Sequence, residues 1–168
     1  MVEVLAKRLR LSGSRILILG AGGAARAAAY ALRAERAELL ITARRPAAAD
    51  RLAKLVSARS LLWDGIDNLD VDAVVNATPI GMPTHTHAEA TPIDISRLRV
   101  RVVFDMVYYP LETRLLAEAR SRGLTAISGL EMLVAQGARQ FEIWTGLAAP
   151  RALMEQAVRQ ALDHPPGG

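Results

Sequence analysis

The sequence predicts an α/β fold in which a doubly wound parallel sheet of about six strands forms the middle of a three-layer α/β/α arrangement. Short apolar runs alternate with helical segments of about 10–15 residues, which is typical of parallel sheets. The runs are apolar throughout, as expected for strands that helices cover on both faces. A glycine-rich turn directly follows the first run, which indicates a Rossmann-type sheet.

The elements are expected in a regular order. Val2, Leu5 and Leu9 have helical spacing, so residues 2–9 are expected to form a short amphipathic helix. The strands are expected at 15–19, 37–43, 59–63, 72–79, 101–108 and 124–128. The helices are expected at 22–34, 46–56, 111–121, 129–145 and 150–162, with an irregular segment at 80–99. We expect one domain over 1–168, made of a leading helix and linker (1–13), a Rossmann core (14–149), a C-terminal helix (150–163) and a tail (164–168).

Composition and charge exclude several classes of protein. The chain has no cysteine, so disulfides and cysteine chemistry are excluded. No apolar run approaches the roughly 20 residues that cross a membrane, and the first residues do not resemble a secretory signal. The net charge of +4 comes from scattered arginines without a basic block, which favours a solvated surface over nucleic-acid binding. We therefore expect a cytoplasmic protein that binds neither nucleic acid nor membrane.

The glycine-rich turn is the first candidate site, and it consists of Gly20, Ala21, Gly22, Gly23, Ala24 and Ala25. Gly20 lets the chain turn sharply, and Gly22 has no Cβ to block a pyrophosphate from the N–H groups of the next helix. A plain tight turn between strand and helix is the alternative. The position of the turn after the first strand favours nucleotide binding.

The end of the second strand indicates which nucleotide is bound. An NAD site places an acidic residue there, but this chain has Arg44 and Arg45 in the sequence TARRP. Two guanidinium groups can pair with a 2′-phosphate, so NADP(H) is favoured over NAD and over S-adenosylmethionine. A solvated arginine pair remains the alternative.

Other corners of the predicted sheet carry weaker signals. Asn76, Ala77 and Thr78 end the fourth strand, where they are expected either to contact a cofactor or to cap the strand. Ser128 and Glu131 have the spacing of a capping box, which favours a structural role for Glu131. The buried face of the helix that follows is expected to contain Leu130, Leu133, Val134, Phe141 and Trp144, while Met132 and Gln136 share another face.

No metal site and no catalytic group are expected from the residues alone. His85 and His87 lie two apart in a loop without further ligands, so a metal is disfavoured. Lys7 and Lys54 are the only lysines, and no general base stands out.

Four segments together resemble the C-terminal half of shikimate dehydrogenases, including their quinate relatives. They are GAGGAARAAAYAL, NATPIGM, DMVYYPLET and GLEMLVAQGARQFEIWTG, and the match runs from about Val2 to Leu162. The resemblance implies that Gly20 to Ala25 bind the diphosphate. It also implies that Ala43, Arg44 and Arg45 replace the Asn-Arg-Thr segment facing the 2′-phosphate. Met106, Gly129 and Met132 would lie beside the nicotinamide, and Tyr108 and Gln136 would reach toward the substrate.

The resemblance also implies what this sequence does not contain. In the family, an N-terminal α/β domain supplies a catalytic Lys and Asp, and no such segment is present here. We therefore expect an NADP(H)-binding domain of an enzyme that interconverts 3-dehydroshikimate and shikimate, inactive alone and binding substrate only with a partner catalytic domain. A stand-alone NADP(H)-binding regulatory module is the alternative. Apolar surface on the first and last helices leaves a homodimer open.

Overall fold

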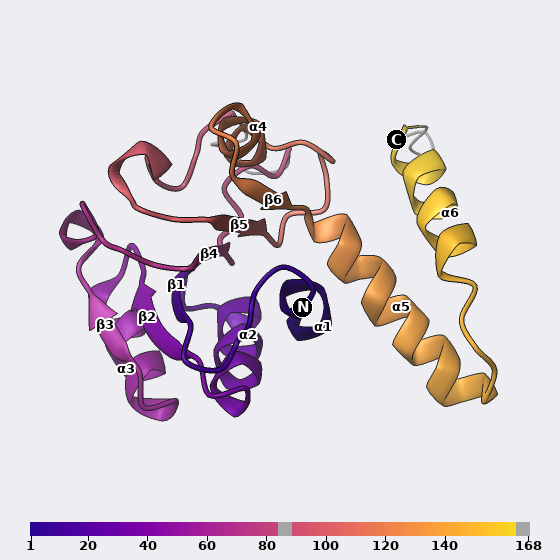
Figure 1. Cartoon of the computed structure of the whole chain (residues 1–168), viewed down its shortest axis with the longest axis horizontal. Coiled ribbons are helices and arrows are strands. Elements are labelled where there is room, and N and C mark those ends of the chain that lie inside the picture. Colours follow the sequence, from indigo (N-terminus) through magenta and orange to yellow (C-terminus); the bar gives the residue numbers. More distant parts are fainter. Residues whose placement is uncertain (84–88, 164–168) are drawn as a thin grey trace.

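The computed structural model describes residues 1–83 and 89–163 and contains the predicted six-stranded parallel sheet (Figure 1). The strand order is β3-β2-β1-β4-β5-β6, so the chain winds outward in both directions from β1 and β4, and the doubly wound fold is confirmed. The strands are β1 (Arg15–Leu19), β2 (Glu38–Thr42), β3 (Arg59–Leu61), β4 (Ala73–Asn76), β5 (Val102–Asp105) and β6 (Thr125–Ile127).

Helices cover both faces of the sheet and make the predicted three layers. The helices are α1 (Val2–Ala6), α2 (Gly23–Ala34), α3 (Pro46–Leu55), α4 (Arg114–Ser121), α5 (Gly129–Thr145) and α6 (Arg151–Asp163), with 3-10 turns η1 (Trp63–Gly65) and η2 (Ile95–Arg97). Buried side chains of α1, α2, α3 and the start of α5 pack on one face of the sheet. Those of α4 and η2 pack on the other face. On β1, Ile16 and Leu17 point to opposite faces and both are fully buried, which explains why the strands are apolar throughout.

Several boundaries differ from the sequence prediction. The first helix ends at Ala6, and β4 ends at Asn76, so that residues 77–79 belong to a turn. Helix α4 begins later than expected, because the hydroxyl of Thr113 accepts a hydrogen bond from Leu116 N (3.3 Å) and caps the helix.

The prediction for the first turn of α5 is wrong in one respect. Ser128 is the N-cap residue, but its side chain makes no capping hydrogen bond. Glu131 instead forms an ion pair with Arg8 (2.8 Å), which connects α5 to the segment after α1. The role of Glu131 is structural, as expected, but it comes from this ion pair and not from a capping box.

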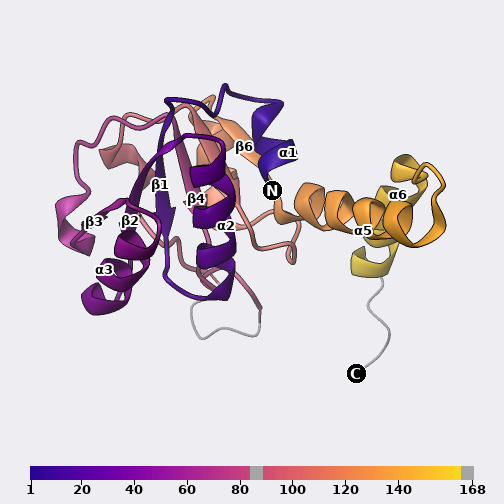
Figure 2. The same cartoon turned by 90° about the horizontal axis from the view of Figure 1, so that it is seen from below.

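The predicted buried face of α5 is also wrong in part. Leu130 is buried as expected, but Met132, Ala135 and Ala138 complete the buried face, and the Trp144 side chain is 79% exposed. Helix α5 leaves the sheet after its first turns, as Figure 2 shows, and α6 packs beside it. The second half of α5 therefore has no sheet to pack against.

Apolar surface is exposed at the end of the described chain and not at its beginning. The large exposed apolar side chains there are Ile143, Trp144, Leu147 and Leu153. Helix α1 buries Val4 and Leu5 in the core, so the expectation of apolar surface on this helix is wrong. Among the described residues, no helix has both the length and the apolar character that crossing a bilayer requires.

Candidate nucleotide-binding site

The turn between β1 and α2 is held between the carboxyl ends of two neighbouring strands. Gly20 N donates to Thr42 O of β2 (2.8 Å), and Ala77 N, after β4, donates to Leu19 O (2.9 Å). Gly20 has a φ of +109°, and a Cβ there would lie 3.0 Å from Ala77 O. Glycine is therefore required at this position, both by its backbone conformation and by its close approach to the next corner.

The N-terminus of α2 opens onto unoccupied space. Gly22 is the N-cap residue and offers no side-chain cap. A Cβ added at Gly22 or at Gly23 would meet nothing within 4 Å. Helix N-termini attract anions through their N–H groups and dipole, so this end of α2 fits a diphosphate. Ala25 is fully buried and lets α2 pack closely on the sheet.

Arg44 and Arg45 follow β2 at the same edge of the sheet. Both side chains are exposed, and neither forms an ion pair with any residue that the structure describes. Ala43, just before them, is buried. The arginine pair is therefore available for an anionic ligand.

One cavity of about 570 Å³ connects these features. Its lining residues are Gly20, Ala21, Gly22, Ala43, Arg44, Arg45, Ala48, Trp63, Ala77, Thr78, Pro79, Ile80 and Pro92. The structure thus brings together the glycine turn, the arginine pair and the corner after β4, as the sequence predicted. Pro79 and Ile80 belong to the same corner after β4, whereas Ala48, Trp63 and Pro92 were not predicted. Of these three, only Trp63, an aromatic residue close after a strand, gave a signal that could have identified it.

Asn76 lies behind the cavity and not in its wall. The side chain is fully buried, and its Oδ1 accepts hydrogen bonds from Thr78 N (3.0 Å) and Thr78 Oγ1 (2.7 Å). Thr78 Oγ1 in turn accepts from Ile80 N (3.3 Å). Asn76 therefore shapes the turn that lines the cavity, which corresponds to the strand-capping alternative.

Asp105, at the end of β5, completes this buried network and was not predicted. Its Oδ1 accepts from Asn76 Nδ2 (2.9 Å) and Val107 N (3.1 Å), and its Oδ2 accepts from Thr113 Oγ1 (2.6 Å). Burial raises the pKa of the Asp105 carboxyl, and these hydrogen bonds oppose the rise. A charged residue directly after a buried apolar strand is the signal that could have identified it.

Gly129 brings the start of α5 against the end of β5. A Cβ at Gly129 would lie 2.5 Å from both Met106 O and Val107 O, and Gly129 N donates to Val107 O (3.2 Å). Met132 is nearly buried and Met106 is half-buried, and both contact the same core cluster. These three residues, which the resemblance associates with the nicotinamide, therefore surround one junction beyond the cavity.

The two residues expected to reach the substrate lie outside the cavity. Tyr108 and Gln136 are both exposed, and neither is among the lining residues. In the described part of the chain, no three His, Asp or Glu side chains gather as a metal site would require. His85 and His87 lie outside the described residues.

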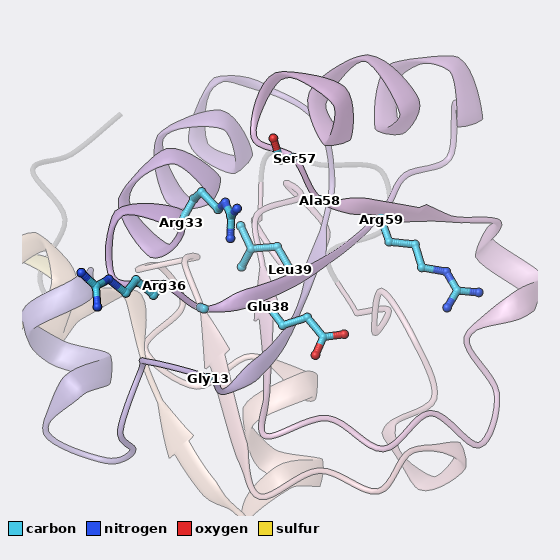
Figure 3. A pocket seen from close by; sticks show the side chains of 9 residues that line it. Gly13, Arg33, Arg36, Glu38, Leu39, Ser57, Ala58 and Arg59 are labelled. Atoms are coloured by element: carbon cyan, nitrogen blue, oxygen red, sulfur yellow. The ribbon is translucent and has the colours of Figure 1, made fainter.

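A second hollow, of about 410 Å³, lies at the opposite edge of the sheet (Figure 3). Its lining includes Arg33, Glu38, Ser57 and Arg59, with Glu38 at the first position of β2. Ligands of doubly wound sheets bind at the carboxyl ends of the strands, and this hollow is at the amino ends. The cavity beside Gly20 is therefore the candidate site.

The fold and the glycine turn define the class: this is a Rossmann-type domain built like those that bind dinucleotides. The family model for shikimate/quinate 5-dehydrogenases matches residues 3–109, and the model for the shikimate 5′-dehydrogenase C-terminal domain matches residues 129–159. The chain belongs to the shikimate/quinate 5-dehydrogenase family.

Relatives of known sequence and structure agree with this assignment. The NADP(+)-dependent shikimate dehydrogenase of Methanosarcina mazei is 42% identical, and the match covers 92% of this chain and 58% of that protein. Shikimate 5-dehydrogenase from Thermus thermophilus, solved with NADP(H) and shikimate, is 38% identical with a TM-score of 0.81 over 96% of this chain and 60% of that one. A shikimate dehydrogenase solved with NADP+ is 34% identical with a TM-score of 0.82, over 95% and 59%. The chain thus spans less than two thirds of the length of these relatives.

Proposed function

We propose that this chain is the NADP(H)-binding domain of a shikimate dehydrogenase. One observation supports the choice of nucleotide above all. Arg44 and Arg45 share a cavity with the glycine turn, without ion-pair partners among the described residues, where an NAD site would place a carboxylate. A guanidinium pair in that position suits a 2′-phosphate.

The cavity suggests how each part of the cofactor is held. The diphosphate lies at the N-terminus of α2, in the space in front of Gly22 and Gly23. Arg44 and Arg45 would hold the 2′-phosphate, and Trp63 would contact the adenine. From the resemblance, Met106, Gly129 and Met132 would border the nicotinamide. NADPH supplies a hydride when bound, and this chain binds and orients it.

The complete reaction transfers that hydride to the carbonyl carbon of 3-dehydroshikimate, and a proton joins the carbonyl oxygen to give shikimate. We propose that a catalytic domain outside this chain supplies the proton from the Lys and Asp that the resemblance implies. Tyr108 and Gln136, both exposed, reach the substrate only when that domain closes over them. By itself, this chain is expected to bind NADPH without turnover.

The apolar side chains at the end of α5 are the surface we assign to that catalytic domain. Ile143, Trp144 and Leu147 are exposed, and an apolar surface of this kind favours association. A homodimer through the same surface is the outcome expected when the chain is studied alone at high concentration. Sedimentation over a range of concentrations measures it, with Trp144→Ala as the variant that shifts the equilibrium toward monomer.

Calorimetric titration with NADPH and NADH tests the choice of cofactor. We expect NADPH to bind at least about tenfold more tightly than NADH, because a charge-assisted hydrogen bond contributes roughly 1.5–3 kcal/mol. Arg44→Asp should abolish this preference. Arg59→Asp, which makes the same charge change at the opposite edge of the sheet, should preserve it.

Two results would contradict the proposal. Equal affinity for NADH and NADPH, or an unchanged ratio in Arg44→Asp, would remove the 2′-phosphate assignment. Formation of NADPH by the purified chain from NADP+ and shikimate would show that it does not need a separate catalytic domain.

A further inference from the structure

The Asp105 carboxyl is surrounded by hydrogen-bond donors. It is fully buried, and three groups donate to it, from Asn76, Val107 and Thr113. Val107 contributes a backbone N–H, which can only donate. The Thr113 hydroxyl donates to Asp105 Oδ2 (2.6 Å), and its hydrogen has no other acceptor among the described residues, while its oxygen accepts from Leu116 N (3.3 Å). Each of these two partners therefore requires an acceptor.

The orientation of the third partner is fixed as well. The Asn76 amide oxygen accepts from Thr78 N (3.0 Å), and this backbone donor settles which end of the amide is oxygen. The NH₂ end of Asn76 must then face Asp105, at 2.9 Å. Three donors directed at one carboxyl that has no acceptor of its own match the ionised form, so this arrangement suits a buried negative charge on Asp105.

Within the described residues, this charge has no cation beside it. Asp105 takes part in none of the ion pairs, which involve other acidic residues. Burial raises the pKa of the carboxyl, and only the three hydrogen bonds lower it, with no contribution from a charged neighbour. No positive charge nearby therefore cancels the electrostatic field of the Asp105 carboxylate. Because the group is buried, water screens this field less, so it extends further than the field of a surface carboxylate.

The place of this charge in the fold relates it to the cofactor. Asp105 holds the peptide N–H of Val107, and Met106 lies between them at the junction with Gly129. Through Asn76 it also supports the turn at Thr78, which lines the end of the cavity away from Arg44. The carboxylate thus lies behind the end of the site to which the nicotinamide is assigned.

We propose that Asp105 is a specificity-determining residue that favours the oxidised over the reduced cofactor. The nicotinamide ring carries a positive charge in NADP+ and none in NADPH, while the rest of the two molecules is alike. A fixed negative charge behind the ring therefore stabilises bound NADP+ selectively. This inference rests on the proposed function and adds to it a role in setting the redox balance of the bound cofactor.

The size of the effect follows from Coulomb's law. Two unit charges about 10 Å apart at an effective dielectric constant of about 20 correspond to roughly a tenfold change in affinity. Stabilising the oxidised form makes bound NADPH a stronger reductant. For a two-electron couple, a tenfold change corresponds to about 30 mV.

The test is the ratio of the dissociation constants for NADP+ and NADPH. It is measured by calorimetry on the unmodified chain, Asp105→Asn, Asp105→Ser and Thr113→Val. We expect both Asp105 variants to weaken NADP+ relative to NADPH by about tenfold, because both remove the charge. Asp105→Ser leaves room for water and provides the measurement if Asp105→Asn does not fold. Thr113→Val removes one hydrogen bond but leaves the charge, so the ratio should stay within about twofold.

The outcomes separate this inference from the proposed function. If the unmodified chain binds both forms and the ratio is unchanged in the Asp105 variants, the inference is overturned and the proposed function stands. A shift of the ratio in Thr113→Val as large as in the Asp105 variants would also overturn it, because the effect would then come from packing. If the unmodified chain binds neither form, the proposed function fails and the inference fails with it.

Discussion

The two edges of the sheet use charge in opposite ways. At the amino edge, several charged side chains pair with one another, among them Arg15 with Glu38 (3.1 Å) and Arg101 with Asp72. At the carboxyl edge, Arg44 and Arg45 have no such partner among the described residues, and Asp105 is held by neutral donors. Both edges carry arginines and a hollow, so neither composition nor cavity volume distinguishes them.

This difference between paired and unpaired charges indicates which side chains can still gain free energy by binding a ligand. An exposed ion pair has already satisfied its charges, so a ligand would have to break it before binding. An unpaired arginine beside a helix N-terminus has an electrostatic interaction still to make. Unpaired arginines alone do not mark the binding edge, because Arg33, Arg36 and Arg59 beside the amino-edge hollow also have no ion-pair partner among the described residues. The carboxyl edge differs in that its unpaired arginines share a cavity with the glycine turn before the N-terminus of α2.

The largest effect is expected where the carboxyl edge is packed most tightly, at Gly129. In Gly129→Ala, the new methyl group would lie 2.5 Å from two backbone oxygens, so α5 or the end of β5 must move. We expect a loss of about 2–3 kcal/mol in the free energy of unfolding, together with weaker NADPH binding. Urea unfolding and calorimetry measure the two effects.

Gly137, two turns further along α5, provides the matched control. A Cβ there would meet nothing within 4 Å, so Gly137→Ala should stabilise the helix by up to about 1 kcal/mol and leave NADPH binding unchanged. Equal effects of the two substitutions would show that the junction at Gly129 is not tightly packed.

Regular features of the site could be predicted from the sequence, and features that depend on side-chain contacts could not. The apolar strands fixed the topology, which placed Gly20, Arg44 and Thr78 at one edge. Trp63 reaches the cavity because β3 ends at Leu61 and a 3-10 turn follows. That turn depends on local backbone geometry and has no periodic signal in the sequence.

The buried network of Asp105 illustrates the same limit. One of its hydrogen bonds joins residues 29 positions apart in the chain, Asn76 and Asp105. Such a pair becomes visible only when β4 and β5 are placed in register, with Asn76 opposite Asp105. The exposed Trp144 was mispredicted for a related reason, because helical spacing does not reveal that α5 leaves the sheet before reaching it.

The two tryptophans test which surface faces the nucleotide. Trp63 lines the carboxyl-edge cavity, whereas Trp144 is exposed on α5. Trp63→Ala should weaken NADPH binding about tenfold or more, the range expected when a base loses its aromatic stacking partner. In Trp144→Phe, the fluorescence of the remaining Trp63 should be quenched by NADPH. Affinity unchanged in Trp63→Ala would place the adenine elsewhere.

Two aspartates, one at each edge, should respond to pH in opposite ways. The pKa of Asp72 is lowered, mainly by a hydrogen bond from Arg15 N (2.9 Å) and also by Arg101. Its contribution to stability is therefore present above the ordinary aspartate pKa, about 3.9, and is lost as the pH falls through the lowered value. The pKa of Asp105 is raised, so its contribution falls as the pH rises from about 3.9 through the raised value.

The substitution Asp72→Asn measures how much the Asp72 carboxylate, at the amino edge, contributes to stability at each pH. At neutral pH we expect a loss of about 1 kcal/mol in the free energy of unfolding, because a charge-assisted hydrogen bond is weakened. The difference from the unmodified chain should shrink as the pH falls below the range in which Asp72 ionises. Denaturant unfolding at several pH values measures it. A difference that grows on acidification would reverse the assigned direction of the pKa shift.

The smallest effect is expected from the exposed ion pair between Arg15 and Glu38. Their side chains are 47% and 55% exposed, and exposed pairs typically contribute only about 0.2–1 kcal/mol because water screens the charges. Glu38→Gln should therefore cost less than about 1 kcal/mol in urea unfolding, and added salt should reduce the cost further. NADPH affinity should not change, since Glu38 begins β2 while Arg44 follows its other end. A weaker affinity for NADPH would mean that the charges of the two edges are coupled through the sheet, and that the paired edge contributes to the site after all.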